Sequence, residues 1–180
     1  MTDAAPSVPL LPLIEELAKK TSVCWLRLEG RTHAAWHAWH DGALCLVTGP
    51  GEQPLPGLAD LAERGGQVEV VMRSKDNGGR LVAWVGEVRR VAPDDTAWEP
   101  VTAALVAGRL NLDDPAATPD RWAASATVVQ VRPTGEAVEA PGTLPDDAHR
   151  AAPLPSPATT RGPLPRVLHR RAGTGRPLDG

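Results

Sequence analysis

Residues 23–48 read VCWLRLEGRTHAAWHAWHDGALCLVT, and apolar and polar side chains alternate along much of this stretch with a period of two. That period is typical of β-strands, whose successive side chains point to opposite faces. Gly30-Arg31 and Asp41-Gly42 interrupt the alternation, and an Asp-Gly pair is a strong signal for a tight hairpin. We therefore predict a three-stranded antiparallel meander with strands over residues 23–29, 32–40 and 43–48.

Three more strands are predicted after a loop rich in Pro and Gly. Residues 67–75 and 80–91 are the longest candidates, and the Asp-Asn-Gly-Gly sequence between them favours a long hairpin. Residues 127–132 form the last strand. Six short strands with neither strand–helix alternation nor a GxGxxG turn predict a mainly β fold, a β-barrel with α insertions.

The helices are predicted from amphipathic spacing and from their end signals. A short amphipathic helix over residues 10–20 would pack on the barrel as a lid. In the helix predicted over residues 93–111, Thr96 and Glu99 have the spacing of a capping box. The other two helices cover residues 58–64 and 118–122, the second opening with Thr118 as its cap and a proline in its first turn.

Composition divides the chain of 180 residues into three parts. Residues 1–22 carry the N-terminal helix, and residues 23–132 form the barrel domain. Residues 133–180 contain nine of the nineteen Pro residues and no aromatic residue. Such a tail buries too little apolar surface to offset its ordering entropy, so we expect residues 133–180 to be disordered and rich in Pro, Ala and Arg.

Charge and cysteine content narrow the class of protein. The net charge of −3 offers no strongly basic face, so we expect no nucleic-acid partner, although the arginines of the tail leave weak anion binding open. The two cysteines, Cys24 and Cys45, lie in no CxxC spacing and are expected to be core thiols. No apolar stretch approaches the roughly 20 residues that cross a bilayer. We expect a cytoplasmic protein with no membrane partner.

Three segments resemble the pyridoxamine-phosphate-oxidase-like, FMN-binding split-barrel superfamily. They are RTHAAWHAWHDG at residues 31–42, LVT at 46–48 and RLVAWVGEV at 80–88, and the resemblance covers roughly residues 23–132. It implies an FMN-binding split barrel, closer to a poorly characterised actinobacterial-like branch than to the oxidase itself. By this resemblance Arg31 would face the FMN phosphate, and the backbone of Val47 and Thr48 would lie near the ring or the ribityl chain.

The phosphate site of that superfamily is not copied intact. Trp36 stands where the oxidase has a Lys, and Gly51-Glu52-Gln53 stands where a Ser-Arg-Lys clamp follows the third strand. A phosphate needs fixed cations and backbone donors. One charged run offers a substitute, and its alternative interpretation is a solvated hairpin tip that guards against edge pairing. The substitute consists of Arg73, Ser74 and Lys75, with Arg80 across the hairpin.

Histidine and tryptophan are concentrated at residues 33–40. On a strand, His33, His37 and Trp39 share one face, and His37 and Trp39 would line a flat aromatic cofactor. Two other interpretations stay open. The side chains pack in the core with polar tips, or His33 and His37 form a zinc pair of helical spacing, for which the Glu of HExxH is replaced by Ala34.

The functional prediction rests on a cofactor, because no nucleophile motif or paired carboxylates are apparent. We expect a flavin-dependent oxidoreductase that uses FMN or a deazaflavin on a small-molecule substrate. The alternatives are a non-enzymatic barrel that binds a flavin, haem or another planar ligand, and a structural or interaction module. Six Trp are more than one small core hides, which predicts a symmetric homodimer.

Overall fold

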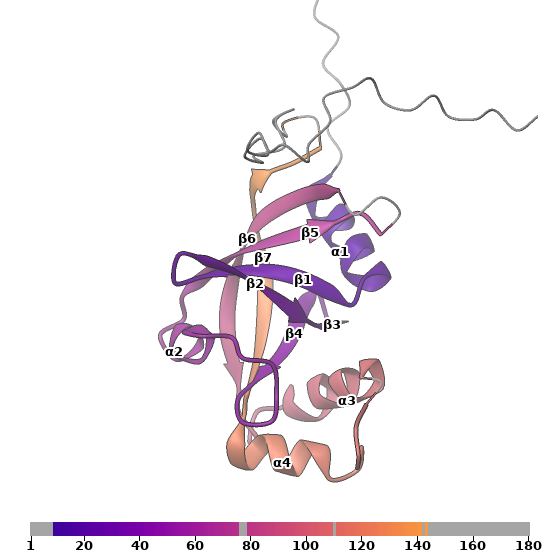
Figure 1. Ribbon diagram of the computed structural model, residues 1–180, viewed down its shortest axis with the longest axis vertical. Coiled ribbons are helices and arrows are strands. Elements are labelled where there is room, and N and C mark those ends of the chain that lie inside the picture. Colours follow the sequence, from indigo (N-terminus) through magenta and orange to yellow (C-terminus); the bar gives the residue numbers. More distant parts are fainter. Residues whose placement is uncertain (1–8, 76–78, 110, 142, 144–180) are drawn as a thin grey trace, which may run out of the picture. The chain divides into compact units, whose positions relative to one another are not determined.

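The computed structural model describes residues 9–75, 79–109, 111–141 and 143 (Figure 1). Within them seven strands form one antiparallel sheet in the order β2-β1-β5-β6-β7-β4-β3. Their bounds are β1 Val23–Leu28, β2 Arg31–Trp36, β3 Ala38–His40, β4 Ala43–Thr48, β5 Gln67–Arg73, β6 Arg80–Val91 and β7 Thr127–Glu139. The helices are α1 Leu10–Lys20, α2 Leu58–Glu63, α3 Trp98–Gly108 and α4 Thr118–Ser125.

The sheet curls because its two edge strands follow each other in the chain. β2 pairs with β1 at one end of the strand order and β3 pairs with β4 at the other, with only His37 between them. The predicted mainly β barrel with α insertions, the split-barrel architecture, is therefore the observed one. The single strand predicted over residues 32–40 is wrong in one respect, since it breaks at His37 so that its halves serve opposite edges.

Both tight turns of the meander adopt left-handed backbone conformations. Asp41 and Gly42 have φ of 48° and 71°, and positive φ at both central residues is what a tight two-residue hairpin turn requires. The first turn lies at Glu29 and Gly30, with φ of 50° and 73°, one residue earlier than predicted. Arg31 is therefore the first residue of β2.

The core fills the barrel interior with aliphatic side chains around one indole. Trp84 on β6 is fully buried together with Leu26 and Leu46. Gly86 lies beside it, where a Cβ atom would collide with Val131 and come within 2.7 Å of the Trp84 ring. The predicted core thiols Cys24 and Cys45 are both fully buried, and burial raises their pKa values to about 12 and about 11.

Helices cover the barrel at three places, at one of which α2 buries Leu58 and Ala62. α1 buries Ile14, Leu17 and Ala18 against it, at the bounds predicted. α3 and α4 lie side by side at one end (Figure 1), over a second apolar cluster that contains Leu105 and Trp122. The predicted capping box does not form in α3, which starts at Trp98, and Asp95 accepts a hydrogen bond from the Ala97 N–H instead.

The last strand runs farther than predicted. β7 continues to Glu139 instead of ending at Arg132, and its second half pairs with β6 at Ala83, Trp84 and Gly86. Cross-strand pairing outweighs the low apolar content of these residues. The rest of the expected tail lies outside the described residues except for positions 140, 141 and 143. Among the described residues no helix is long and apolar enough to cross a membrane.

Candidate functional site

The predicted cationic run lies where β5 ends. A bulge between Met72 and Arg73 disrupts the pairing with β6, and the Ser74 N–H donates to the Gly79 carbonyl at 2.8 Å. The Arg73 guanidinium lies over the indole of Trp25, 4.4 Å from the ring centroid. Within the described part of the chain neither Arg73 nor Lys75 forms an ion pair. This end of β5 therefore exposes positive charge beside an aromatic surface.

These side chains line an open hollow of about 410 Å³, which we call the cationic hollow. A second hollow of about 450 Å³ shares four of its residues and adds an apolar wall from α1 and β6. We call this one the leucine hollow. The cationic hollow is lined by Lys20, Thr21, Ser22, Val23, Trp25, Arg73, Ser74 and Lys75, and the leucine hollow by Leu13, Glu16, Leu17, Lys20, Thr21, Ser74, Lys75 and Leu81.

Two arginines of the predicted site do not join this group. Arg80 is the register partner of Arg73, yet its guanidinium forms an ion pair with Glu139 at 2.8 Å. Arg31 pairs with Leu28 at the far end of the β1–β2 hairpin, about five residues along the sheet from Arg73. At about 3.3 Å per residue this separates the two backbones by roughly 16 Å, so Arg31 and Arg73 do not converge on one phosphate.

Val47 and Thr48 belong to the opposite edge of the sheet. Val47 is fully buried in the second apolar cluster. The Thr48 hydroxyl donates to the Gln53 carbonyl at 3.0 Å and accepts from the Leu55 N–H at 3.2 Å. These contacts use the hydroxyl to shape the loop that follows β4.

His37 and Trp39 also lie away from the cationic hollow. The His37 ring is buried beneath α1, with Nε2 3.2 Å from the Ala18 carbonyl, and Nδ1 has no hydrogen-bond partner in the described part of the chain. Burial lowers the pKa of His37 to about 4, against a small opposing effect of the Ala18 hydrogen bond. Trp39 packs half-buried on the main core. Among the described residues no group of three or more His, Cys, Asp or Glu is placed to hold a metal ion.

A second polar cluster centres on Glu52, which lies in the loop where the superfamily's phosphate clamp was expected. Its carboxylate accepts from Trp122 Nε1 at 2.8 Å, pairs with Arg121 at 2.9 Å and pairs with Arg109. The Glu52 side chain is only 1% exposed. Burial raises the pKa of Glu52, but the three donors outweigh burial and hold it below the usual value. We call these four residues the Glu52 cluster.

Beside this cluster lies a hollow of about 360 Å³, the Trp36 hollow. Gln53 closes one wall, because its amide accepts from the Trp36 N–H at 2.7 Å and donates to the carbonyls of Trp36 and Val47. The Arg109 guanidinium lies 5.8 Å from the centroid of the Trp36 ring. The lining consists of Ser22, Trp36, Glu52, Gln53, Gly108, Arg109 and Asn111.

Sequence reasoning missed the residues that complete both sites. Trp25 and Lys20 flank the cationic run only through the packing of β1 and α1. Arg109 follows the end of α3, and Arg121 lies within α4. In the sequence, only the position of Glu52 within a Gly- and Pro-rich loop hinted at a buried carboxylate. That position did not identify Arg109, Arg121 or Trp122 as its partners.

No family model matches the chain, and neither does any curated protein. Solved structures show likenesses of fold. A candidate pyridoxamine 5′-phosphate oxidase from Listeria innocua is 19% identical, covering 69% of this chain and 94% of its own, with a TM-score of 0.45. The haem storage protein HutZ from Vibrio cholerae is 15% identical, covering 70% and 91%, with a TM-score of 0.47. The FAD and haem binding protein from Mycobacterium smegmatis is 16% identical, covering 90% and 95%, with a TM-score of 0.46. Likenesses of this degree carry no conclusion about ligand or activity.

Proposed function

We propose that this chain binds a flat cofactor with an anionic side group, of the flavin or deazaflavin class, across the cationic and leucine hollows. The observation that carries the proposal is the placement of Arg73 and Lys75 beside Trp25 around an open hollow of about 410 Å³. Hollows of about 300–1,000 Å³ suit small-molecule cofactors.

The charge of the two hollows favours a phosphate. Their described lining carries Lys20, Arg73 and Lys75 against the carboxylate of Glu16, which leaves three positive charges against one negative, a net charge of +2. A ribityl phosphate such as that of FMN is a dianion near neutral pH and matches this charge. Arg73 would bind it with the fork of its guanidinium and Lys75 as a point charge.

The apolar part of the cofactor has a separate surface. Leu13 and Leu17 of α1 and Leu81 of β6 form a wall next to the cations. A flat ring buried against this wall gains the hydrophobic contribution, while the phosphate stays with Arg73 and Lys75. α1 would then cover the ring, as predicted for a lid.

The donor set favours a flavin over haem. None of the described residues lining the two hollows is a His, Cys or Met, so these hollows offer no usual axial ligand for haem iron. When bound, a flavin supplies two-electron transfer. The residues of this chain bind it, orient it and exclude water from one face. The activity we propose is therefore that of an oxidoreductase, with planar-ligand binding without turnover as the alternative.

We also propose that the chain forms a homodimer. β1 and β2 present Val23, Trp25, Ala34 and Trp36 on their outer side, where Val23 is 40% exposed and the two indoles are half-buried. A second subunit packed on this face would also form one wall of the cationic hollow and of the Trp36 hollow, because Trp25 and Trp36 line them. Light scattering at micromolar concentration checks it, and a monomeric mass contradicts it.

Titration of the protein with FMN, followed by quenching of flavin fluorescence, tests the cofactor proposal. We expect binding by the wild type and a Kd weakened by about ten- to a hundredfold in Arg73→Ala, because a charge-assisted hydrogen bond contributes about 1.5–3 kcal/mol. Arg90→Ala is the matched control, since Arg90 lies on β6 with its guanidinium on Glu63.

Two outcomes contradict the proposal. If the wild type binds neither FMN nor a deazaflavin at high micromolar concentration, the proposed cofactor is wrong. If Arg73→Ala and Arg90→Ala bind FMN equally well, the cationic hollow is not the binding site.

A further inference from the structure

Apart from Ser22, the Trp36 hollow is built by groups that the proposed cofactor site does not use. Trp36 is the last residue of β2, and Arg109 follows the end of α3. The Trp36 hollow shares only Ser22 with the cationic hollow. Arg109 lies close enough to the indole of Trp36 for a cation–π contact. One wall is therefore aromatic and the adjoining one cationic.

The Glu52 cluster leaves the guanidinium of Arg109 only partly neutralised. Arg121 shares the Glu52 carboxylate with Arg109 from outside the Trp36 hollow, so Glu52 does not fully neutralise Arg109. The Glu52 side chain is almost fully buried, and its carboxylate is paired with Arg109, Arg121 and the Trp122 indole N–H. Its negative charge is therefore balanced by the two arginines. A single anionic group on a ligand matches what remains.

Donors remain on Arg109 once Glu52 is satisfied. A guanidinium has five N–H donors, and the hydrogen bond to Glu52 uses the Nη1 group. The Gln53 amide is fully engaged with the Trp36 and Val47 backbone, so it offers nothing to a ligand. Recognition falls to Arg109, to the Trp36 ring, and to the side chains of Ser22 and Asn111.

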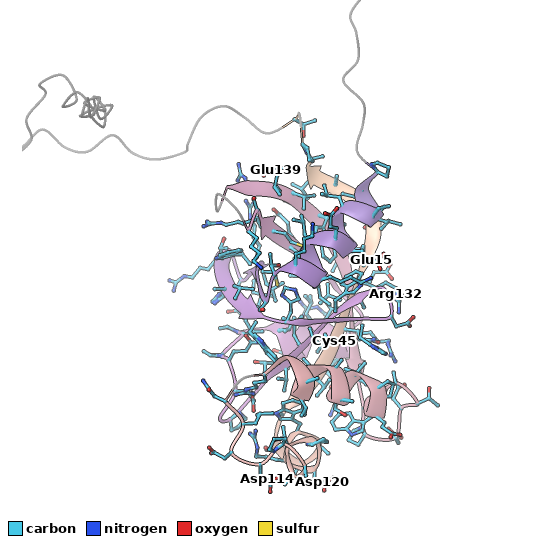
Figure 2. The ribbon with its side chains drawn as sticks, turned by 90° about the vertical axis from the view of Figure 1, so that its right-hand side faces the viewer. Glu15, Cys45, Asp114, Asp120, Arg132 and Glu139 are labelled. Atoms are coloured by element: carbon cyan, nitrogen blue, oxygen red, sulfur yellow. The ribbon has the colours of Figure 1, made fainter. Side chains whose placement is uncertain are left out.

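The neighbouring hollow on the other side of Arg109 has no aromatic residue in its described lining. It measures about 490 Å³ and is lined by Asp113 and Asp114 as well as by Arg109 and Arg121. Asp114 lies at that end of the molecule with α4, far from Glu139 (Figure 2). A ligand that carries both an aromatic ring and a carboxylate therefore finds a ring surface beside Arg109 only on the Trp36 side.

We infer that the Trp36 hollow is a second binding site, specific for a small aromatic monocarboxylate. The carboxylate lies on Arg109, whose planar fork matches it, and the aromatic ring lies against the indole of Trp36. Glu52 acts as a positioning residue that holds Arg109 in place. The site does not depend on the proposed cofactor.

The test uses 4-fluorobenzoate as the probe and the indole N–H signals of ¹⁵N-labelled protein as the readout. We expect millimolar probe to shift the Trp36 signal, assigned by its loss in Trp36→Phe, and to leave the Trp25 signal unmoved. The uncharged 4-fluorobenzamide should shift neither. A Trp25 shift without a Trp36 shift, or no shift with either probe, overturns the inference. FMN should shift the Trp25 signal at lower concentration than the Trp36 signal. The two probes therefore distinguish a failure of the cofactor site from a failure of this site.

Substitutions of the two arginines sharpen the assignment. Arg109→Gln should weaken the affinity for 4-fluorobenzoate by about tenfold or more, the value of one charge-assisted contact. Arg121→Gln removes the other partner of Glu52 without touching the Trp36 hollow, and should weaken affinity by no more than about threefold. Equal losses in the two variants overturn the placement beside Trp36. Should Arg109→Gln not fold, Gly108→Leu fills the same hollow, since a Cβ there already comes within 3.7 Å of the Trp36 ring, and retained probe binding then contradicts the inference.

Discussion

Among the described residues, an arginine guanidinium lies over a tryptophan ring at two places, and only one of these arginines is paired with a carboxylate. Arg73 lies 4.4 Å from the Trp25 ring with no ion pair among the described residues, whereas Arg109 lies 5.8 Å from the Trp36 ring and is held by Glu52. A guanidinium without an internal anion leaves its charge for a ligand. One with a buried carboxylate becomes a structural clamp that keeps part of its donors for recognition.

The largest expected effect is the loss of stability when the carboxylate of the Glu52 cluster is removed. Glu52→Gln leaves Arg109 and Arg121 facing each other without a carboxylate, and we expect a loss of about 3 kcal/mol in the free energy of unfolding. This is the lower end for breaking a buried pair, because both guanidiniums keep some contact with water. Urea unfolding followed by circular dichroism measures it.

Glu63→Gln is the control for that measurement. The Glu63–Arg90 pair is exposed on both sides, so its loss should change the unfolding free energy by less than about 1 kcal/mol. If Glu52→Gln costs no more than Glu63→Gln, the Glu52 cluster is not a clamp and the contrast between the two arginines fails.

Lowering the pH should destabilise the packing of α1 beside the cationic hollow while the Glu52 cluster stays charged. The buried His37 holds the C-terminal part of α1 through the Ala18 carbonyl, and α1 carries Lys20 to the cationic hollow. Because the pKa of His37 is about 4 when folded and about 6.5 when unfolded, the unfolded chain takes up more protons as the pH falls. Stability should therefore drop by about 2–3 kcal/mol between pH 6.5 and 4.5.

The Glu52 cluster stays charged over that window, because the pKa of Glu52 is held below its usual value of 4.5. Urea midpoints measured against pH should flatten in His37→Gln, whose amide keeps a donor for the Ala18 carbonyl. A wild-type profile that is level between pH 6.5 and 4.5 refutes the role of His37.

The smallest effect comes from converting a paired arginine into an unpaired one. Glu139→Gln frees Arg80, the register partner of Arg73, and adds positive charge beside the cationic hollow. We expect FMN to bind about two- to fivefold more tightly at low salt, the range of a partly exposed ion pair, with the gain lost as salt screens it. Unchanged or weaker binding at low salt shows that Arg80 does not contribute to this surface.

Some features of the fold were predictable because they are encoded within a few residues. The Asp41-Gly42 hairpin, the bounds of α1 and those of β6 follow from turn chemistry and periodicity. The end of β7 did not follow from composition, since it depends on the length of its partner β6. Of the predicted site, only the neighbours Arg73, Ser74 and Lys75 came together in one hollow.

The sequence by itself determined a mainly β barrel, its first hairpins and a cationic run at the end of one strand. Only the tertiary structure decided which arginine is neutralised. Glu52 meets Arg109 and Trp122 across 57 and 70 residues, and β1 lays Trp25 under Arg73 through pairing with β5. Turns and periodicity act between near neighbours in the chain, whereas ion pairing depends on burial and distance. Those two quantities are fixed only when the sheet curls and the helices close over its ends.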